Sequence, residues 1–310
     1  MKKISLILLL AAASISLSAQ QRLEAQEVLS FFEKNGTVRM ETEELDAAAD
    51  TLVVVQHRKD DVVWSRMVYR IIDMRYKQNY QLYFPTDPYD SQYMSLWRLI
   101  MQAVKEGVPI YRKKGADVFK PEFHDSLLVA RDQVSDYFLV GSIADMNRDD
   151  PDTYLMPYDS VNDVFNLNFT RYESYIRNQL KFVIQEVIFF DRHTSRLHRQ
   201  IISIAPMQPD MAEQGSPMRF LTTSIRFWIL YQDLRPYLAK NYMIPFQNET
   251  KRVTFDEYFQ KRLYTSYLIG EGNMYNRMIL EYAKTMEEAQ KEQARIENEL
   301  LTFEQDLWEY

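Results

Sequence analysis

The sequence contains no cysteine among its 310 residues, and only 7 glycines and 4 histidines. Without cysteine there is no disulfide, no thiolate nucleophile and no thiolate-bound metal. The small number of glycines argues against Gly-rich phosphate loops and against an all-β protein with many tight turns. No G-x-S-x-G, H-E-x-x-H or P-loop motif occurs. The common sequence signatures of hydrolases, zinc peptidases and nucleotide-binding enzymes are therefore missing.

Positive charge is also in short supply. The chain has 37 Lys and Arg against 44 Asp and Glu, a formal net charge of −7. A surface of this sign disfavours binding to nucleic acid and to anionic membranes. After residue 20 no stretch approaches eighteen uninterrupted apolar residues, so no membrane span is expected.

Residues 1–19 have the pattern of a secretory signal peptide. Lys2 and Lys3 precede an apolar run from Ile4 to Leu17, and small residues follow as far as Ala19. No cysteine follows the run, so we expect a mature protein without a lipid anchor. Its roughly 290 residues suffice for one large domain or two small ones, and an exported chain without disulfides must gain its stability from burial.

Aromatic residues are abundant, with 21 Tyr and 17 Phe, which favours an extended contact surface as well as a packed core. Hydrophobic periodicity divides the chain into mixed elements. Helices are expected at 21–34, 60–77, 95–107, 168–186, 233–241 and 254–269, the last with continuation as a strand left open. Strands are expected at 80–85, 108–113, 136–143 and 226–231. This mixture predicts an α+β fold with an antiparallel sheet.

The expected domain organisation follows from these elements. After the signal peptide comes an N-terminal helix and acidic linker at 20–54, whose stretch 41–50 is interpreted as solvated. A core domain is expected at 55–270. A C-terminal helix with a heptad pattern is expected at 271–310.

The stretch FFDRHTSRLHRQIISIAP, residues 189–206, places Asp191 and two histidines, His193 and His198, close together in sequence. It predicts a β-hairpin. With a two-residue turn at 194–195, Asp191 faces His198 and raises its pKa by stabilising the imidazolium, whereas a three-residue loop moves His198 to the other face. No further ligand lies near in sequence, so we interpret these residues as holding the hairpin together or contacting a neighbouring subunit, not as a metal site.

An acidic loop also resembles the start of a calcium-binding EF-hand. Asp145, Asn147 and Asp149 have the required spacing, but Asp150 stands where the loop needs glycine and Met156 where it needs glutamate. A solvated loop is the better interpretation, and no metal, cofactor or catalytic residue is predicted anywhere in the chain.

The tail, residues 276–310, has apolar residues at alternating steps of three and four, interrupted by Gln293. This heptad pattern predicts a helix on the order of 50 Å long. Acidic residues occupy the flanking positions, so a parallel copy of the helix would be repelled. We predict that the helix binds another subunit, and packing against its own chain is the alternative left open. The predicted partner-binding residues are Ile279, Tyr282, Met286, Ile296, Leu300, Phe303 and Leu307.

Several segments resemble the GldN/PorN family. They are VVWSRMVYRIIDMRYKQNYQLYFP, SLWRLIMQAVKEGVPIY, FFDRHTSRLHRQIISIAP, FWILY and FDEYFQKRLYTSYLI, and their order matches over roughly residues 55–270. The family belongs to the gliding-motility and type IX secretion machinery of Bacteroidetes. The resemblance implies a non-enzymatic subunit in the periplasm, held at the inner face of the outer membrane by a lipoprotein partner.

The resemblance also implies partners. Family members assemble with a lipoprotein, GldK or PorK, and with copies of themselves into a ring that contacts the motor subunit GldM or PorM. The alternative from a different class is an exported hydrolase or carbohydrate-binding protein with a carboxylate-lined cleft. Sequence alone does not place two acids across such a cleft.

Overall fold

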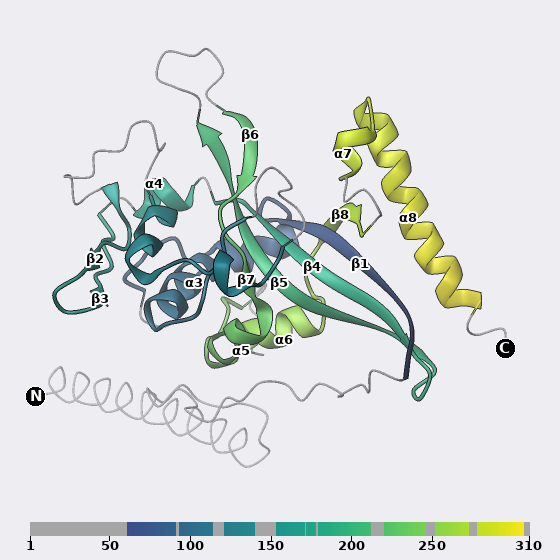
Figure 1. The fold of residues 1–310 in the computed structure, drawn as a ribbon, viewed down its shortest axis with the longest axis horizontal. Helices are drawn as coiled ribbons and strands as arrows, with labels where there is room; N and C mark the ends of the chain where they lie inside the picture. Colours follow the sequence, from purple (N-terminus) through teal and green to yellow (C-terminus); the bar gives the residue numbers. More distant parts are fainter. Residues whose placement is uncertain are drawn as a thin grey trace, which may run out of the picture. The chain divides into compact units, whose positions relative to one another are not determined.

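The computed structural model describes residues 61–90, 93–113, 121–139, 153–170, 172–177, 179–211, 220–245, 252–272 and 278–306. Four expectations lie outside these residues: the signal peptide at 1–19, the helix at 21–34, the acidic linker at 41–50 and the calcium-like loop at 145–150. The described part is an α+β fold built on an antiparallel sheet, as predicted (Figure 1).

The main sheet has the strand order β6-β5-β4-β1-β8, with β7 pairing additionally with β5. All of its pairings are antiparallel. The strands are β1 (Val62–Asp73), β4 (Lys181–Asp191), β5 (Arg196–Met211), β6 (Phe220–Ile225), β7 (Ile229–Leu230) and β8 (Ser266–Glu271).

Strand β1 corrects the predicted helix at 60–77. Its residues include seven of high β propensity, namely Val62, Val63, Trp64, Val68, Tyr69, Ile71 and Ile72. The strand pairs with β4 along its length and with β8 at its C-terminal end. Both faces are covered at that end, so apolar residues occur there without alternation, and the pattern imitates that of a helix.

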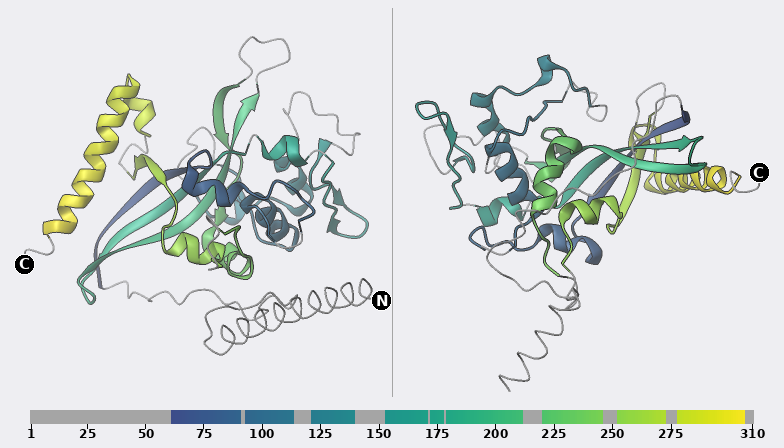
Figure 2. Two further views of the ribbon diagram at one scale, coloured as in Figure 1. Left: turned by 180° about the vertical axis from the view of Figure 1, so that it is seen from behind. Right: turned by 90° about the horizontal axis from the view of Figure 1, so that it is seen from below.

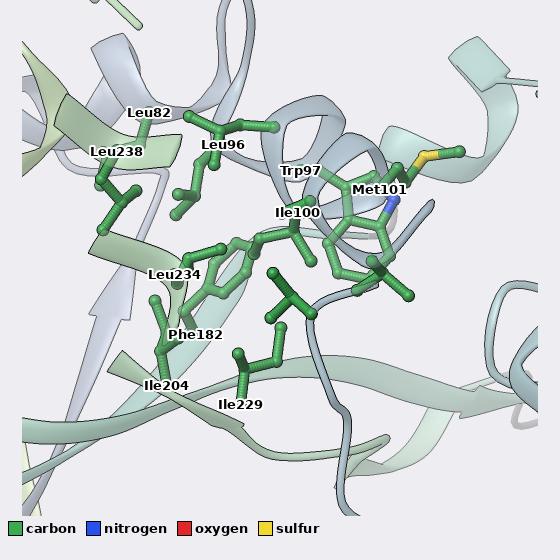
Figure 3. Close-up of a cluster of buried hydrophobic side chains, with 14 of the residues drawn as sticks. Leu82, Leu96, Trp97, Ile100, Met101, Phe182, Ile204, Ile229, Leu234 and Leu238 are labelled. Atoms are coloured by element: carbon green, nitrogen blue, oxygen red, sulfur yellow. The ribbon is translucent and has the colours of Figure 1, made fainter. Parts of the chain in front are cut away.

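A helical layer covers one end of the sheet on the face of Ile72, Phe182 and Ile184. Helix α3 (Leu96–Lys105) begins where the Ser95 hydroxyl accepts a hydrogen bond from the Arg98 amide at 3.3 Å. Its buried residues belong to one apolar cluster with those of α5 (Tyr231–Lys240) and α6 (Phe255–Gln260). Figure 3 shows Trp97 of α3 in this cluster, together with Leu234 and Leu238 of α5. These three helices confirm the predictions at 95–107, 233–241 and the first part of 254–269.

The opposite face of the sheet carries a second apolar cluster. Tyr69 and Ile71 of β1, Val183 of β4, Ala205 of β5 and Ile269 of β8 meet there, as alternation along each strand requires. Both faces of the central strands are therefore buried at this end of the sheet.

Several predicted boundaries are wrong. Residues 168–186 form the short helix α4 (Tyr172–Ile176) and then β4, because pairing with β1 and β5 favours a strand from Lys181 onward. The segment 80–85 forms the helix α2 (Tyr80–Tyr83), which follows the 3-10 helix η2 (Lys77–Asn79) and ends before Pro85. Tertiary contacts override local propensity at each of these places.

The expected strands are also reduced. Within 108–113 pairing occurs at Tyr111, which bridges to Leu128 and Trp228. Within 226–231 the strand β7 has two residues and is followed directly by α5. Of 136–143, residues 136–139 are described: the first two end the 3-10 helix η4 (Arg131–Tyr137), and Leu139 forms an isolated bridge to Tyr154. The remaining elements are η3 (Asp125–Leu127) and a small hairpin of β2 (Tyr158–Asp159) and β3 (Val164–Phe165).

The C-terminal region forms two helices instead of one. Helix α7 (Ile279–Tyr282) ends at Ala283, whose backbone is extended, and α8 (Met286–Asp306) follows. The Thr285 hydroxyl accepts from the Glu288 amide at 3.2 Å, while the Glu288 carboxylate accepts from the Lys284 amide at 2.8 Å. This capping arrangement starts a new helix inside the predicted continuous one. Figures 1 and 2 show α8 alongside β8 and β1, separate from α3, α5 and α6.

Candidate interaction site

The site is built on the part of the sheet that α3, α5 and α6 leave uncovered. Trp64 and Val68 of β1 point to the same face as Ile72, because alternate residues of a strand share a face. Ile188 of β4 and Leu268 of β8 complete an apolar strip on this face.

Helix α8 covers this strip with one stripe of its surface. Ala289, Ile296 and Leu300 are buried against the sheet, and the Phe303 ring lies 4.5 Å from the Trp64 ring, measured between centroids. The steps of seven, four and three residues place these side chains on one face of the helix. The helix is therefore held by a narrow apolar stripe within its own chain.

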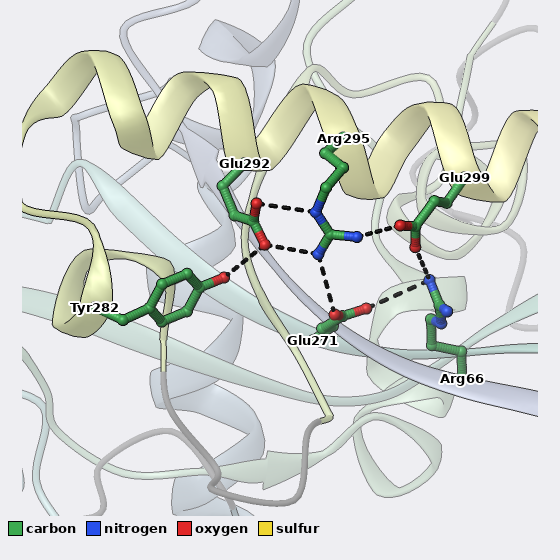
Figure 4. A network of polar contacts seen from close by, with 6 residues as sticks. All are labelled: Arg66, Glu271, Tyr282, Glu292, Arg295 and Glu299. Carbon is green, nitrogen blue, oxygen red and sulfur yellow. Dashed lines mark hydrogen bonds and ion pairs between the residues drawn. The ribbon is translucent and has the colours of Figure 1, made fainter.

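One flank of α8 is held by exposed or half-buried charges (Figure 4). Arg295 binds Glu292 at 2.6 Å and also Glu299 on the same helix. Arg66 of β1 lies 3.3 Å from Glu299 and 3.4 Å from Glu271 of β8. The guanidinium of Arg295 lowers the pKa of Glu292, so Glu292 is charged at neutral pH and forms an ion pair with Arg295.

Tyr282 joins this network from α7. Its hydroxyl donates to Glu292 at 3.1 Å. Burial and this hydrogen bond raise the pKa of Tyr282 to about 12. The tyrosine therefore remains a hydrogen-bond donor at neutral pH and links α7 to α8.

The other flank of α8 meets a buried polar cluster. Glu186 of β4 is completely buried and accepts hydrogen bonds from Arg262 at 3.0 Å and from the Tyr264 hydroxyl at 2.7 Å. Arg70 of β1 lies 3.6 Å from Glu186 and 3.1 Å from Glu297 of α8. Arg70 therefore connects the buried carboxylate to the helix.

Electrostatics within this cluster are strongly coupled. Burial, followed by the charge of Glu186, raises the pKa of Tyr264 well above its ordinary value. Burial alone would lower the pKa of Arg262, but Tyr264 and Glu186 outweigh it and raise that pKa. Arg199 of β5, which lies 3.7 Å from Glu304 of α8, has its pKa lowered by burial and by the neighbouring Arg262 and Arg70. Acidic residues of α8 thus offset an excess of arginine on the sheet.

A groove of about 560 Å³ remains between α8 and the N-terminal half of β1. It is lined by Trp64, Arg66, Arg295, Asn298, Glu299, Leu300, Thr302, Phe303 and Asp306. Its walls combine aromatic rings with the paired charges of the first flank. Such a lining is suited to contact with a polypeptide surface more than to chemistry on a small substrate.

The predicted partner-binding residues divide into three groups. Ile279, Ile296 and Leu300 are buried within the chain itself, and Phe303 is half-buried against Trp64. Tyr282 and Met286 are exposed. Leu307 lies outside the described residues. Of the two arrangements left open by the sequence, the structure has the helix packed on its own sheet.

The hairpin prediction needs a correction in its register. Strands β4 and β5 form the hairpin, but Asp191 faces Arg196, and His198 faces Phe189. The turn has four residues instead of two and ends at Ser195 in the left-handed conformation, with φ 51°. The predicted register, with Asp191 directly opposite His198, is therefore wrong.

The polar side chains of the turn make local contacts. The carboxylate of Asp191 accepts from the His193 amide at 2.8 Å. The His198 ring stacks on Phe189 at 5.6 Å and lies 2.7 Å from the Thr194 hydroxyl. Among the residues that the structure describes, no group of three or more His, Asp or Glu is arranged to hold a metal ion.

Sequence reasoning missed the arginines of the sheet and their buried partner Glu186. Reading 60–77 as a helix put Arg66 and Arg70 on the side away from the apolar row. In a strand, the alternation of Trp64, Arg66, Val68 and Arg70 places all four on one face. That alternation was the available signal.

Comparison with known proteins adds one finding to this geometry. The family model described as "Gliding motility associated protein GldN" matches residues 57–309. The match extends past residue 270, where the sequence resemblance was expected to end, and so includes α7 and α8. No curated protein matches the chain. No helix in the described ranges is long and apolar enough to cross a membrane.

Proposed function

Since this chain belongs to the gliding motility associated GldN family, we propose that it is a structural subunit of the type IX secretion machinery. The observation that carries this proposal is the family match over residues 57–309, which covers all the described elements. In this role the protein acts by holding other proteins in place and catalyses no reaction.

The proposed partners are those that the family resemblance implies. The subunit binds a GldK/PorK-type lipoprotein, which holds it in the periplasm at the inner face of the outer membrane. Together with further copies of itself it builds a ring. The ring contacts the GldM/PorM-type motor subunit and supports protein export, as well as gliding where the cell glides.

Two structural features support an assembly role. The groove beside α8 is open and lined by aromatic rings and paired charges, which is the composition of contact surfaces. Exposed apolar side chains are also present on α7 and α8, where Leu280 and Met286 are 62% and 69% exposed. Exposed apolar residues clustered on one region favour binding to another protein.

The test is a pull-down of the purified mature protein with the lipoprotein at physiological salt. We expect a stable complex, and co-expression should yield particles far larger than a one-to-one pair. Circular dichroism of each component checks that both are folded. Absence of a complex between folded components, or turnover of glycans or peptides by the purified protein, would reject the proposal.

A further inference from the structure

Strand β1 lies next to the terminal strand β8, and its two edges are paired over different lengths. Strand β1 pairs with β4 over its whole length, but β8 pairs only with Val68–Ile72. The last contact is a hydrogen bond of 2.7 Å from the Gly272 amide to the Met67 carbonyl. Within the described ranges, no strand adjoins Val62–Arg66 on this side.

The backbone of Ser65 points to this open side. Residues two apart in a strand direct their N–H and C=O groups the same way. The Met67 carbonyl points toward β8, so the N–H and C=O of Ser65 point to the space where β8 would continue. Ser65 is exposed and Val63 is 67% exposed. An edge of this kind is a template for another strand.

The groove beside α8 runs along the same part of β1. Trp64 and Arg66 line it from the strand, and Leu300 and Phe303 line it from the helix. Three of the four charged side chains that line it are paired, because Arg66 contacts Glu271 and Glu299, and Arg295 also contacts Glu299. A strand that carried a further charge beside these three paired groups would leave that charge without a partner, so an uncharged strand fits best there.

The opposite end of the same sheet supplies such a strand. Strand β6 (Phe220–Ile225) is terminal in the strand order and pairs with β5 alone among the described strands. Its sequence, FLTTSI, contains no charged residue and no proline. Each molecule therefore carries two different strand edges. One edge, on β6, is neutral, and the other, on β1, adjoins a groove in which most charges are paired.

We propose that β6 of one copy adds to the open edge of β1 in the next copy, so that the sheet continues from molecule to molecule. Backbone hydrogen bonds supply the affinity of such a contact, and the groove selects the side chains. The contact joins unlike surfaces, so it can repeat in a ring. This inference rests on the proposed ring and specifies the contact between its copies.

A matched pair of substitutions tests the edge. Ser65→Pro removes the N–H that points away from β4 and leaves the β1–β4 hydrogen bonds in place, whereas Ser65→Ala keeps that N–H. With the lipoprotein co-expressed, we expect Ser65→Pro to weaken the contact between copies at least about tenfold, since the strand loses a donor and gains a clash. Particle size by analytical ultracentrifugation should fall for Ser65→Pro and stay unchanged for Ser65→Ala.

The pull-down separates this inference from the proposed function. Retained lipoprotein binding by Ser65→Pro, with loss of the large particles, supports the inference. Large particles for both variants, or loss of lipoprotein binding by a folded Ser65→Pro variant, overturn it. A wild-type protein that fails to bind the lipoprotein rejects the proposed function instead.

Cysteine cross-linking gives an independent test, because the natural chain contains no cysteine. Ser65→Cys and Thr223→Cys are purified separately, mixed with the lipoprotein and mildly oxidised. We expect a covalent dimer that contains one of each variant. Its absence in assembled particles, with Thr222→Cys tried as the neighbouring position, overturns the inference, as does efficient cross-linking of Ser65→Cys to itself.

Discussion

Glu186 is the residue on which the polar cluster under α8 depends. It is completely buried and balances Arg262 and, at longer range, Arg70. Hydrogen bonds to a buried carboxylate offset the cost of its desolvation, but removal of the carboxylate leaves the neighbouring arginines without a counter-charge. Loss of Glu186 would therefore destabilise the charged forms of both Arg262 and Arg70.

We expect Glu186→Gln to lower the free energy of unfolding by about 3 kcal/mol, because it leaves buried positive charge uncompensated. Urea denaturation followed by tryptophan fluorescence measures this. The control is Glu173→Gln, which breaks an exposed ion pair with Arg177 and should change stability by less than about 0.5 kcal/mol. Equal effects of the two substitutions would contradict the role assigned to Glu186.

Asp73, at the end of β1, should make stability depend on pH. Burial alone would raise the pKa of Asp73, but hydrogen bonds and the charge of Arg75 outweigh burial and lower it. A carboxyl whose pKa is lowered in the folded state stabilises the protein above its unfolded pKa of about 4. This stabilisation is lost as the pH falls through the folded pKa.

Asp73→Asn should therefore destabilise the protein at pH 7, by about 1 kcal/mol because Arg75 is largely exposed. The difference between variant and wild type should shrink between pH 5 and pH 3, and urea titrations across that range measure it. Arg75→Ala in the Asp73→Asn background should add little. A difference that stays constant with pH would show that the charge of Asp73 is not what stabilises.

At the scale of elements, two adjacent leucines in α8 test how this helix is held. Leu300 is 4% exposed against the sheet, whereas Leu301 is 52% exposed. Leu300→Ala should cost about 3 kcal/mol through the lost contacts and the cavity. Leu301→Ala changes the intrinsic helix propensity by the same amount, and it should lower the free energy of unfolding by less than about 0.5 kcal/mol. Thermal unfolding compares the two, and similar losses would mean that α8 does not pack on the sheet in solution.

Elements differed in how well the sequence predicted them. Helix α3 was predicted well, since Ser95 begins it, Gly107 follows it with φ 113°, and its apolar residues have a clear helical period. Strand β1 was mistaken for a helix because its C-terminal half is buried on both faces and loses the alternation that marks a strand. Both neighbours of β1, the strands β4 and β8, are distant in sequence. The local sequence pattern therefore could not predict that this half of β1 is buried on both faces.

The C-terminal region shows the same limit. The heptad pattern correctly selected the residues of α8 that become buried, including Ile296 and Leu300. It did not show what covers them, since the arginines of β1 and β5 that face the acidic flanks are more than a hundred residues away. The break between α7 and α8 was visible in the sequence as Thr285 followed by Glu288, a capping pattern that the heptad interpretation overlooked.

At the scale of the whole molecule, removal of α8 tests whether the sheet is complete without it. A chain ending at Lys284 exposes Val68, Ile188 and Leu268 and leaves Arg70 and Arg199 without their acidic partners on the helix. We expect the melting temperature to fall by several degrees, about 4 °C per kcal/mol at most for a chain of this size. An unchanged melting temperature would show that α8 serves a partner and not its own chain.

The antiparallel α+β class was predictable for the whole chain, because helical patterns alternate with a hairpin and with extended segments. The candidate site was not, because it depends on which faces of β1, β4 and β5 meet α8. A one-residue difference in register would exchange those faces. The register is decided by burial along the complete sheet, which local sequence does not contain.

Strand β8 stops at Glu271, whereas β1 continues to Val62. This difference in strand length offers a way to prevent self-association of the protein. A β8 lengthened by a few residues would form hydrogen bonds with the backbone groups at the open edge of β1 within the same chain. If the open edge joins neighbouring copies, the lengthened variant should be a folded monomer. The length of β8 would then control self-association. Inserting or deleting a few residues at its end changes this length without replacing any side chain of the fold.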